Sequence, residues 1–305
     1  MDDDRLLHRL HFKAAARLAP MPPARWNTST NGSRGFRPTC VSGVSIGAFT
    51  AAIVASHPDD PVPALKEFWN ELTVSCPFLP HDIERRLAVF GNPAFYRPRL
   101  DLFTLPSWTY LYDLTPIRQT LARYVDFARI ASAKVGLVVT ATDIVSGEIK
   151  EFYNGDASDP ITIEHLIASG SLPPSYPPAV IGGCSYWDGG LFDNTPLGSL
   201  LKRITPEDAA RMRVIVINLF PDTGKVPRTM LDVWDRMIEL QFANKTSKDV
   251  ELARTINALL CCSAARRRCR AAPTSAGSTS RAPTSRRRSP ISPAASATGS
   301  TSRSC

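Results

Sequence analysis

The chain has 305 residues, of which 43% are hydrophobic and 21% charged, and a formal net charge of +8. This length suits one large domain with a sizeable core, or two smaller ones. The charge is unevenly spread, because residues 261–305 hold nine arginines and no lysine, aspartate or glutamate, which leaves the rest close to neutral. The body therefore lacks the basic footprint of a nucleic-acid-binding domain, and we expect no specific nucleic-acid partner.

The cysteines and the amino terminus bear on the compartment. Seven cysteines occur without any Cys-x-x-Cys pair. This spacing fits neither a zinc site nor a disulfide framework, so we expect no metal, no cofactor and a reducing compartment. The opening MDDDRLLHRLHFK lacks the basic and apolar regions of a secretory signal, and no apolar run reaches the ~18 residues of a membrane span. These features predict a soluble, cytoplasmic protein.

Residues 1–34 form an atypical opening segment. MDDDRLLHRLHFKAAARLAP is compatible with a short helix, whereas MPPARWNTSTNGSRG is rich in proline, asparagine and serine and is typical of a loop. We therefore expect this segment to be partly disordered.

The stretch VSGVSIGAFTAAIVAS carries a Gly-x-Ser-x-Gly motif, formed by Gly43, Ser45 and Gly47. Where a strand reverses sharply into a helix, the middle residue is strained, and a Cβ on the flanking glycines would collide with its neighbours. Ser45 would then stand exposed at the start of a helix, where the free N–H of Ile46 and the helix dipole favour an oxyanion. The alternative is an ordinary Gly/Ser turn.

The next elements are two helices separated by an irregular segment. Hydrophobic residues recur with helical spacing in VPALKEFWNELT, at Leu65, Phe68, Trp69 and Leu72. The prolines and aromatics between Cys76 and Tyr112 resist long regular elements, and indicate either a lid or acyl-chain cavity wall, or an irregular packed connection. A helix is predicted from Asp113 to Phe127, with Thr115 as N-cap and Pro116 at the first helical position.

Strands and helices alternate further along. Strands are predicted at Val135 to Thr142 and Glu148 to Tyr153, with Asp143 supporting the turn between them. A helix is expected at Ile161 to Ser169. The remaining predicted elements are a buried strand at Arg213 to Leu219 and a helix at Thr229 to Ala243, whose apolar stripe is Met230, Val233, Trp234, Met237 and Leu240.

A second motif, Asp188-Gly189-Gly190, lies inside YWDGGLFDNTPL. Alone it is typical of a hairpin turn. In order, however, GVSIGA, ASGSLPPSYPP and WDGGLFDNTPL resemble the patatin-like phospholipases, in particular their bacterial branch, over about Gly35 to Thr246. The resemblance implies an α/β, three-layer fold with a mostly parallel central sheet and helices on both faces. It also implies that Ser45 is the nucleophile and Asp188 the general base of a catalytic dyad, with Gly189 and Gly190 allowing close backbone approach.

The histidines favour this dyad over a Ser-His-Asp triad. In α/β-hydrolases the histidine follows the acid along the chain. None of the five histidines follows Asp188. His165 lies within a predicted helix and His57 at the end of another, where we expect structural roles.

The chain departs from the family pattern before the serine. The family carries a glycine-rich oxyanion loop after its first strand, but only Gly32 and Gly35 precede Gly43, too close to Ser45 for an intervening helix. Either the first strand and loop are missing, or the early residues come from an altered start or reading frame. Family membership and activity are therefore separate hypotheses, since one oxyanion donor is typically worth roughly 10²–10³ in turnover.

We thus expect three regions: residues 1–34, a patatin-like domain at 35–260 and a disordered Arg/Ser/Pro-rich tail at 261–305. The tail is either a binder of anionic lipid or nucleic acid, or a frameshifted end. The predicted function is a lipid acyl hydrolase that works through an acyl-enzyme, is peripheral to a membrane and contacts its surface transiently to reach a lipid or ester substrate. The alternatives are a catalytically impaired domain that binds lipid or a protein partner, and a protein that binds through its basic tail.

Overall fold

The computed structural model describes most of the region that carries both motifs. The described residues are 7–12, 38–73, 90–132, 134–192, 197–203, 212–217, 224–243, 251, 254–255 and 257. The chain divides into two compact units, Met1–Asp249 and Val250–Cys305. In the second unit the described residues, Glu251, Arg254, Thr255 and Asn257, are helical.

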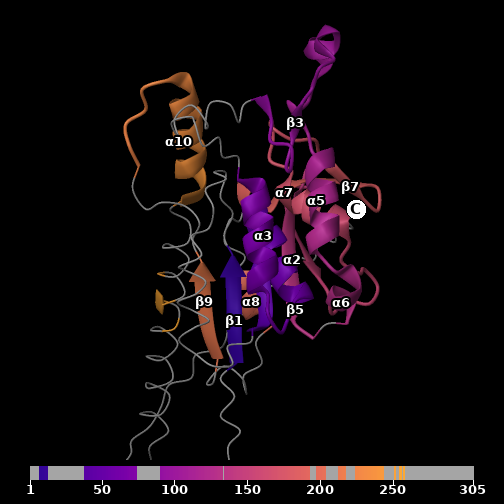
Figure 1. The fold of residues 1–305 in the computed structure, drawn as a ribbon. Coiled ribbons are helices and arrows are strands. Elements are labelled where there is room, and N and C mark those ends of the chain that lie inside the picture. Colours follow the sequence, from indigo (N-terminus) through magenta and orange to yellow (C-terminus); the bar gives the residue numbers. More distant parts are fainter. Residues whose placement is uncertain are drawn as a thin grey trace, which may run out of the picture. The chain divides into compact units, whose positions relative to one another are not determined.

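A mixed sheet forms the centre of the first unit (Figure 1). Its parallel strands are β9 (Met212–Ile217), β1 (Leu7–Phe12), β2 (Pro38–Gly43) and β5 (Gly136–Asp143), adjacent in that order. Antiparallel strands continue it from β5, namely β6 (Ile149–Tyr153), β8 (Cys184–Asp188) and, beside β8, β7 (Ala179–Ile181). The predicted α/β class with a mostly parallel core is confirmed.

Strand β1 corrects the interpretation of the amino-terminal segment. Leu7–Phe12 is a strand, although its sequence is compatible with a short helix, and it lies between β2 and β9, with Leu10 opposite both Val41 and Ile215. A first strand is therefore present ahead of the serine motif. Local sequence allowed a helix, but pairing with two neighbouring strands decided the conformation. Residues 13–37, where the expected loop and both early glycines fall, lie outside the described residues.

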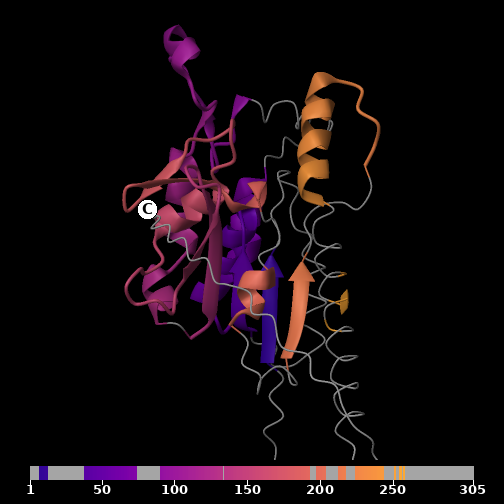
Figure 2. The ribbon, with the colours of Figure 1, turned by 180° about the vertical axis from the view of Figure 1, so that it is seen from behind.

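Helices cover both faces of the sheet, which confirms the three-layer arrangement. Sheet side chains alternate between faces. Val41, Leu137 and Val139 belong to the large core with α2 (Ile46–Ser56), α3 (Val62–Leu72), α5 (Thr115–Tyr124), α6 (Phe127–Ala131) and α7 (Ile163–Gly170). Cys40 and Val138 instead cluster with Leu200 of α8 (Leu197–Leu201), which lies on the opposite face in Figure 2.

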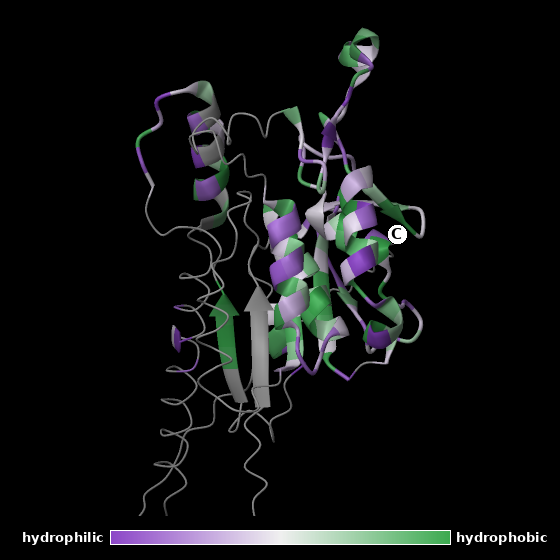
Figure 3. Cartoon of the chain, viewed as in Figure 1, coloured by the Kyte–Doolittle hydropathy of each residue, from purple (hydrophilic) through white to green (hydrophobic). Residues whose placement is uncertain are grey.

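The central helix α2 is buried along its whole length. It is green in Figure 3, whereas the outer helix α3 is largely purple. The predicted stripe of α3 is confirmed, since Leu65, Phe68, Trp69 and Leu72 are all buried. The core between these layers therefore holds the serine motif's helix rigidly against the sheet.

Several predicted boundaries and environments differ in detail. The prediction of Thr115 as N-cap is wrong: α5 begins at Thr115, so Pro116 is its second residue, and it ends at Tyr124 rather than Phe127. Leu114 is the N-cap, and the Asp113 carboxylate accepts from the Thr115 N–H at 2.9 Å. The Asp143 turn is confirmed, with Oδ1 accepting from Val145 and Ser146 N–H at 2.9 Å each.

The predicted buried strand is only half-buried at residues 214–217, because β9 ends the described sheet. Helix α10 (Met230–Ala243) forms as expected, but its apolar stripe is exposed: Met230, Val233, Trp234, Met237 and Leu240.

The irregular segment before α5 is a short hairpin. β3 (Arg97–Pro98) pairs with β4 (Tyr112–Asp113), and a 3₁₀ helix, η2 (Leu102–Ser107), lies between them. Residues 74–89 lie outside the described residues. Across the described part of the chain, no helix is long and apolar enough to cross a membrane.

Candidate active site

Ser45 occupies a strained turn between β2 and α2. Its φ of 55° and ψ of −133° make it the single non-glycine residue with positive φ in the described part of the chain. Every other residue from Cys40 to Ser56 is buried, whereas Ser45 is partly exposed. Such strain costs of order 1–3 kcal/mol and is concentrated at functional sites. The turn therefore presents the serine side chain at the surface of an otherwise closed core.

Gly43 of the motif is required by close packing at this turn. A Cβ on Gly43 would lie 2.2 Å from the Gly47 carbonyl oxygen, an impossible contact. The same holds at the second motif, where a Cβ on Gly189 would lie 2.6 Å from the Thr140 carbonyl oxygen. At Gly43 and Gly189 the predicted need for glycine follows from backbone approaching backbone.

The sheet brings the two motifs together. β6 pairs with residues 138–142 along one edge of β5, so β2 and β8 must share the other edge. β2 ends with Gly43 opposite Val139, and the antiparallel β8 ends with Asp188 opposite Ala141. The two strands therefore run toward each other and end only two positions apart on β5. Ser45 and Asp188, distant in sequence, meet in the gap between them.

The Asp188 carboxyl lies beside Ser45, and a side-chain hydrogen bond from Ser45 lowers its pKa. The Gly190 N–H also donates to Asp188 Oδ1 at 2.7 Å, at the start of the short 3₁₀ helix η3 (Gly189–Leu191). The backbone of Asp188 is fixed as well: its N–H donates to the Ser171 carbonyl at 3.0 Å, and its carbonyl accepts from Thr142 Oγ1 at 3.1 Å. The backbone of Asp188 and one of its carboxylate oxygens are thus held in place by hydrogen bonds.

Burial changes the acidity of this carboxylate. Asp188 is 2% exposed, and desolvation raises its pKa to about 7, although the bonds from Ser45 and Gly190 act in the opposite direction. Loss of water disfavours the ionised form. A carboxylate with a pKa near neutrality is a stronger proton acceptor than an ordinary aspartate, and it is still ionised in a useful fraction at pH 7.

The amino end of α2 supplies a donor beside Ser45. Within the described residues the Ile46 N–H makes no backbone hydrogen bond, as expected in the first turn of a helix. The Ser45 N–H, in contrast, donates to Ser169 Oγ at 2.9 Å. The predicted oxyanion donor Ile46 is therefore next to the serine, and Ser169 holds the strained turn in place.

Two neighbours of the site were not singled out from the sequence. Ser169 contacts the Ser45 backbone, and the half-buried Tyr176 has a pKa raised well above its usual value, by desolvation first and then by Tyr96, Tyr112 and Asp188. Both lie in the segment ASGSLPPSYPP, between the two motifs. The resemblance of this segment to the family pattern could have drawn attention to it. Its spacing from the two motifs does not by itself predict that it lies next to Ser45.

The two described histidines outside the strands have other partners. His165 Nδ1 accepts from the Thr162 N–H at 2.9 Å, completing a capping box at α7, and Nε2 lies 3.3 Å from Asp159. His57 follows α2 as its C-cap, with Nδ1 3.0 Å from the Ile53 carbonyl. The described residues also contain no cluster of three or more His, Cys, Asp or Glu side chains that could hold a metal. The expected structural roles of both histidines are confirmed.

Comparison with known proteins gives a family. The model of the patatin-like phospholipase family matches residues 10–201, nearly two thirds of the chain, beginning inside β1. Among solved structures, VipD from Legionella pneumophila is similar at 15% identity and a TM-score of 0.37, covering 69% of this chain and 50% of that one. The chain thus spans about half the length of that protein, and no curated protein matches it significantly. On the family match, which includes both the Gly-x-Ser-x-Gly and the Asp-Gly-Gly motifs, the chain belongs to the patatin-like phospholipase family.

Proposed function

We propose that this protein is a serine acyl hydrolase that cleaves lipid carboxylic esters, with Ser45 as nucleophile and Asp188 as general base. Patatin-like phospholipases in general hydrolyse lipid esters. The observation that supports the assignment to these residues is the approach of a strained, partly exposed serine to a buried carboxylate, at strand ends two positions apart on β5. A serine hydroxyl needs such a base to become a nucleophile.

The proposed reaction has two halves. Ionised Asp188 accepts the Ser45 proton while Oγ attacks the ester carbonyl. The tetrahedral intermediate then collapses, and the leaving alkoxide takes the proton from Asp188, which releases the alcohol. A water molecule next gives a proton to Asp188 and attacks the acyl-enzyme. The carboxylic acid departs as Ser45 recovers its proton.

The developing oxyanion needs a preorganised donor. Ile46 N–H fills this role in the proposal, because it lies one residue after the nucleophile at the positive end of a buried helix. Ser169 acts as a positioning residue, since it fixes the Ser45 backbone at 2.9 Å and thereby the direction of that helix terminus.

The test is covalent labelling with a fluorophosphonate probe, combined with hydrolysis of a short-chain p-nitrophenyl ester. The wild type is expected to be labelled and to release nitrophenol, whereas Ser45→Ala should abolish both. Asp188→Asn should lower both by at least ~10³-fold, by analogy with the loss of other positioned bases. Ser132→Ala is the matched control, because that serine is exposed at the end of α6 and bonds only locally, to the Arg129 carbonyl.

Two outcomes would contradict the proposal. Equal labelling of the wild type and Ser45→Ala would remove Ser45 as nucleophile. A folded wild type that neither reacts with the probe nor hydrolyses any ester would favour the alternative of a catalytically impaired domain that binds lipid or a protein partner. Circular dichroism and thermal unfolding of each variant distinguish both outcomes from misfolding.

A further inference from the structure

The hairpin β3–η2–β4 carries an unusual surface. At and beside its turn, four large apolar side chains are strongly exposed: Leu100 at 86%, Leu102 at 68%, Phe103 at 87% and Leu105 at 55%. Figures 1 and 2 show the helical turn at the outer end of the hairpin, away from the sheet. From Leu102 to Trp108 the sequence LFTLPSW contains no charged residue. We call Leu100–Leu105 the hairpin tip.

The tip has apolar residues on more than one side. In a 3₁₀ helix, residues three apart lie above one another. Leu102 and Leu105 therefore share one side of η2, Phe103 and Pro106 the next, and Thr104 and Ser107 the third. A surface built to dock on a protein presents one complementary face, whereas apolar groups on two of three sides suit a medium that surrounds them.

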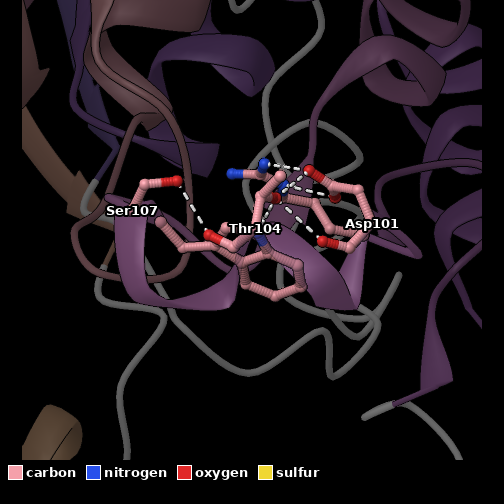
Figure 4. Close-up of polar contacts among 5 residues, drawn as sticks. Asp101, Thr104 and Ser107 are labelled. Carbon is pink, nitrogen blue, oxygen red and sulfur yellow. Dashed lines mark hydrogen bonds and ion pairs between the residues drawn. The ribbon is translucent and has the colours of Figure 1, made fainter.

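Polar groups at the tip are satisfied locally, as Figure 4 shows. Thr104 Oγ1 donates to Asp101 Oδ2 at 2.6 Å and accepts from Trp108 Nε1 at 2.8 Å. Ser107 Oγ donates to the Thr104 carbonyl at 2.8 Å. Since these groups already have partners, the tip can enter an apolar medium without leaving them unpaired.

Three amphipathic side chains flank the tip in sequence, namely Arg99, Trp108 and Tyr110. The Arg99 guanidinium lies between two rings, 4.4 Å from the centroid of Trp108 and 4.6 Å from that of Tyr110, and pairs with Asp101. The hydrogen bonds from Arg99 and Thr104 lower the pKa of the Asp101 carboxyl. Trp, Tyr and Arg at this position have apolar bodies and polar ends, which is the composition found at membrane–water interfaces.

The base of the hairpin is joined to the candidate active site. The N–H groups of Leu111 and Tyr112 donate to the Ser175 carbonyl at 3.2 and 2.9 Å. The next residue is Tyr176, whose ring centroid lies 6.3 Å from that of Tyr112. The charge of Asp188 contributes to the raised pKa of the Tyr176 hydroxyl. The segment that borders Ser45 therefore also anchors the hairpin.

From these contacts we propose that the hairpin tip inserts into the surface of a phospholipid bilayer and brings the Ser45 site to lipid esters there. The benefit of insertion to this protein rests on the proposed function, since insertion would bring a hydrolase to its substrate. Insertion itself does not require catalysis. Lipid is favoured over a protein partner because the apolar groups face two sides and the tip's polar atoms are locally paired.

The test uses the full chain with Ser45→Ala, so that the vesicles are not hydrolysed. Binding to phosphatidylcholine vesicles is measured by co-sedimentation, because a zwitterionic lipid avoids attraction to the arginine-rich end. Adding Leu102→Ser and Phe103→Ser should weaken binding at least tenfold. The matched control adds Val145→Ser and Val226→Ser, two side chains that are 85% and 87% exposed elsewhere in the first unit, and should bind as Ser45→Ala does.

Insertion is then measured directly. A Leu102→Cys variant carrying an environment-sensitive dye should shift its emission to the blue when vesicles are added, whereas the same dye on Val145→Cys should not. Equal binding of tip and control variants, or no dye shift at Leu102, would overturn the proposal. If the tip changes alter self-association without vesicle binding, the tip contacts a second copy and the proposal is wrong.

A last comparison separates this inference from the proposed function. With Ser45 intact, the tip variant should keep the wild-type rate on a water-soluble short-chain ester but lose most activity on vesicle lipid. Tip-dependent vesicle binding without any esterase activity would leave the membrane inference standing and contradict the proposed hydrolase.

Discussion

At the scale of single residues, Asp188 determines what the site can do. It is almost fully buried, no cationic side chain among the described residues pairs with it, and desolvation raises its pKa to about 7. The same burial that makes the carboxylate a better base also makes its charge costly to the fold. Activity and stability should therefore depend on pH in opposite directions.

The first consequence is a pH profile. Asp188 must be ionised to accept the Ser45 proton, so kcat/KM for a short-chain ester should rise about tenfold per pH unit below pH 7 and level off above it. Measurement between pH 5 and 9 with a pH-independent chromophore checks this. A flat profile through this range would mean that Asp188 does not act as the base.

The second consequence concerns stability. A raised folded-state pKa means that the folded protein binds the proton more tightly, so this group destabilises the fold progressively as pH rises from about 4 to 7. Asp188→Asn, which cannot ionise, should be more stable than the wild type at pH 8 by about 2–4 kcal/mol and equal to it near pH 4. Urea unfolding at the two pH values checks the difference, and a loss of stability at pH 8 would contradict it.

At the scale of elements, the strand–turn–helix at Ser45 depends on close backbone packing. Gly43→Ala places a Cβ 2.2 Å from the Gly47 carbonyl oxygen, so we expect a loss of more than ~2 kcal/mol in unfolding free energy. Gly198→Ala is the matched control, because a Cβ at that helical position has no neighbour within 4 Å, and it should be neutral or stabilising by up to ~1 kcal/mol. Equal effects of the two changes would contradict this account of the turn.

The Asn154 side chain hydrogen-bonds to backbone groups at the end of α6, before β5 and within β5. Its side-chain amide donates to the carbonyls of Ile130 and Val135 at 2.9 Å, and its oxygen accepts from the Leu137 N–H at 2.7 Å. Asn154→Ala leaves these buried backbone groups unpaired and should cost roughly 2–4 kcal/mol in urea unfolding. Asn70→Ala, on the exposed face of α3, should change stability by less than ~0.5 kcal/mol. If both variants unfold alike, the amide does not join these segments.

At the scale of the whole molecule, the residues that carry the net positive charge are not those that match the family. The basic excess of the chain belongs to residues 261–305, whereas the family match ends at residue 201. Removing residues 261–305 should therefore leave kcat/KM on a soluble ester and thermal unfolding unchanged, while abolishing salt-sensitive binding to anionic vesicles. A truncated protein that unfolds earlier or loses activity would show that these residues support the domain.

Much of the architecture could be predicted from local sequence. Helix α3 followed from four apolar residues on one face, the β5–β6 hairpin from two strand-forming runs around Ser146-Gly147, and the turn at Asp143 from its side-chain chemistry. These features depend on residues near one another in the chain. The order of the two glycine motifs similarly indicated the family and the pair Ser45 and Asp188.

Tertiary structure decided the rest. Leu7–Phe12 became a strand because β2 and β9 offered backbone partners on both sides, which no local pattern records. The contact between Ser45 and Asp188 required β2 and β8 to end against each other on one edge of β5, and the raised pKa of Asp188 required the burial that results. The sequence determined which chemical groups this protein carries, whereas strand pairing and exclusion of water decided which of them meet and how acidic they are.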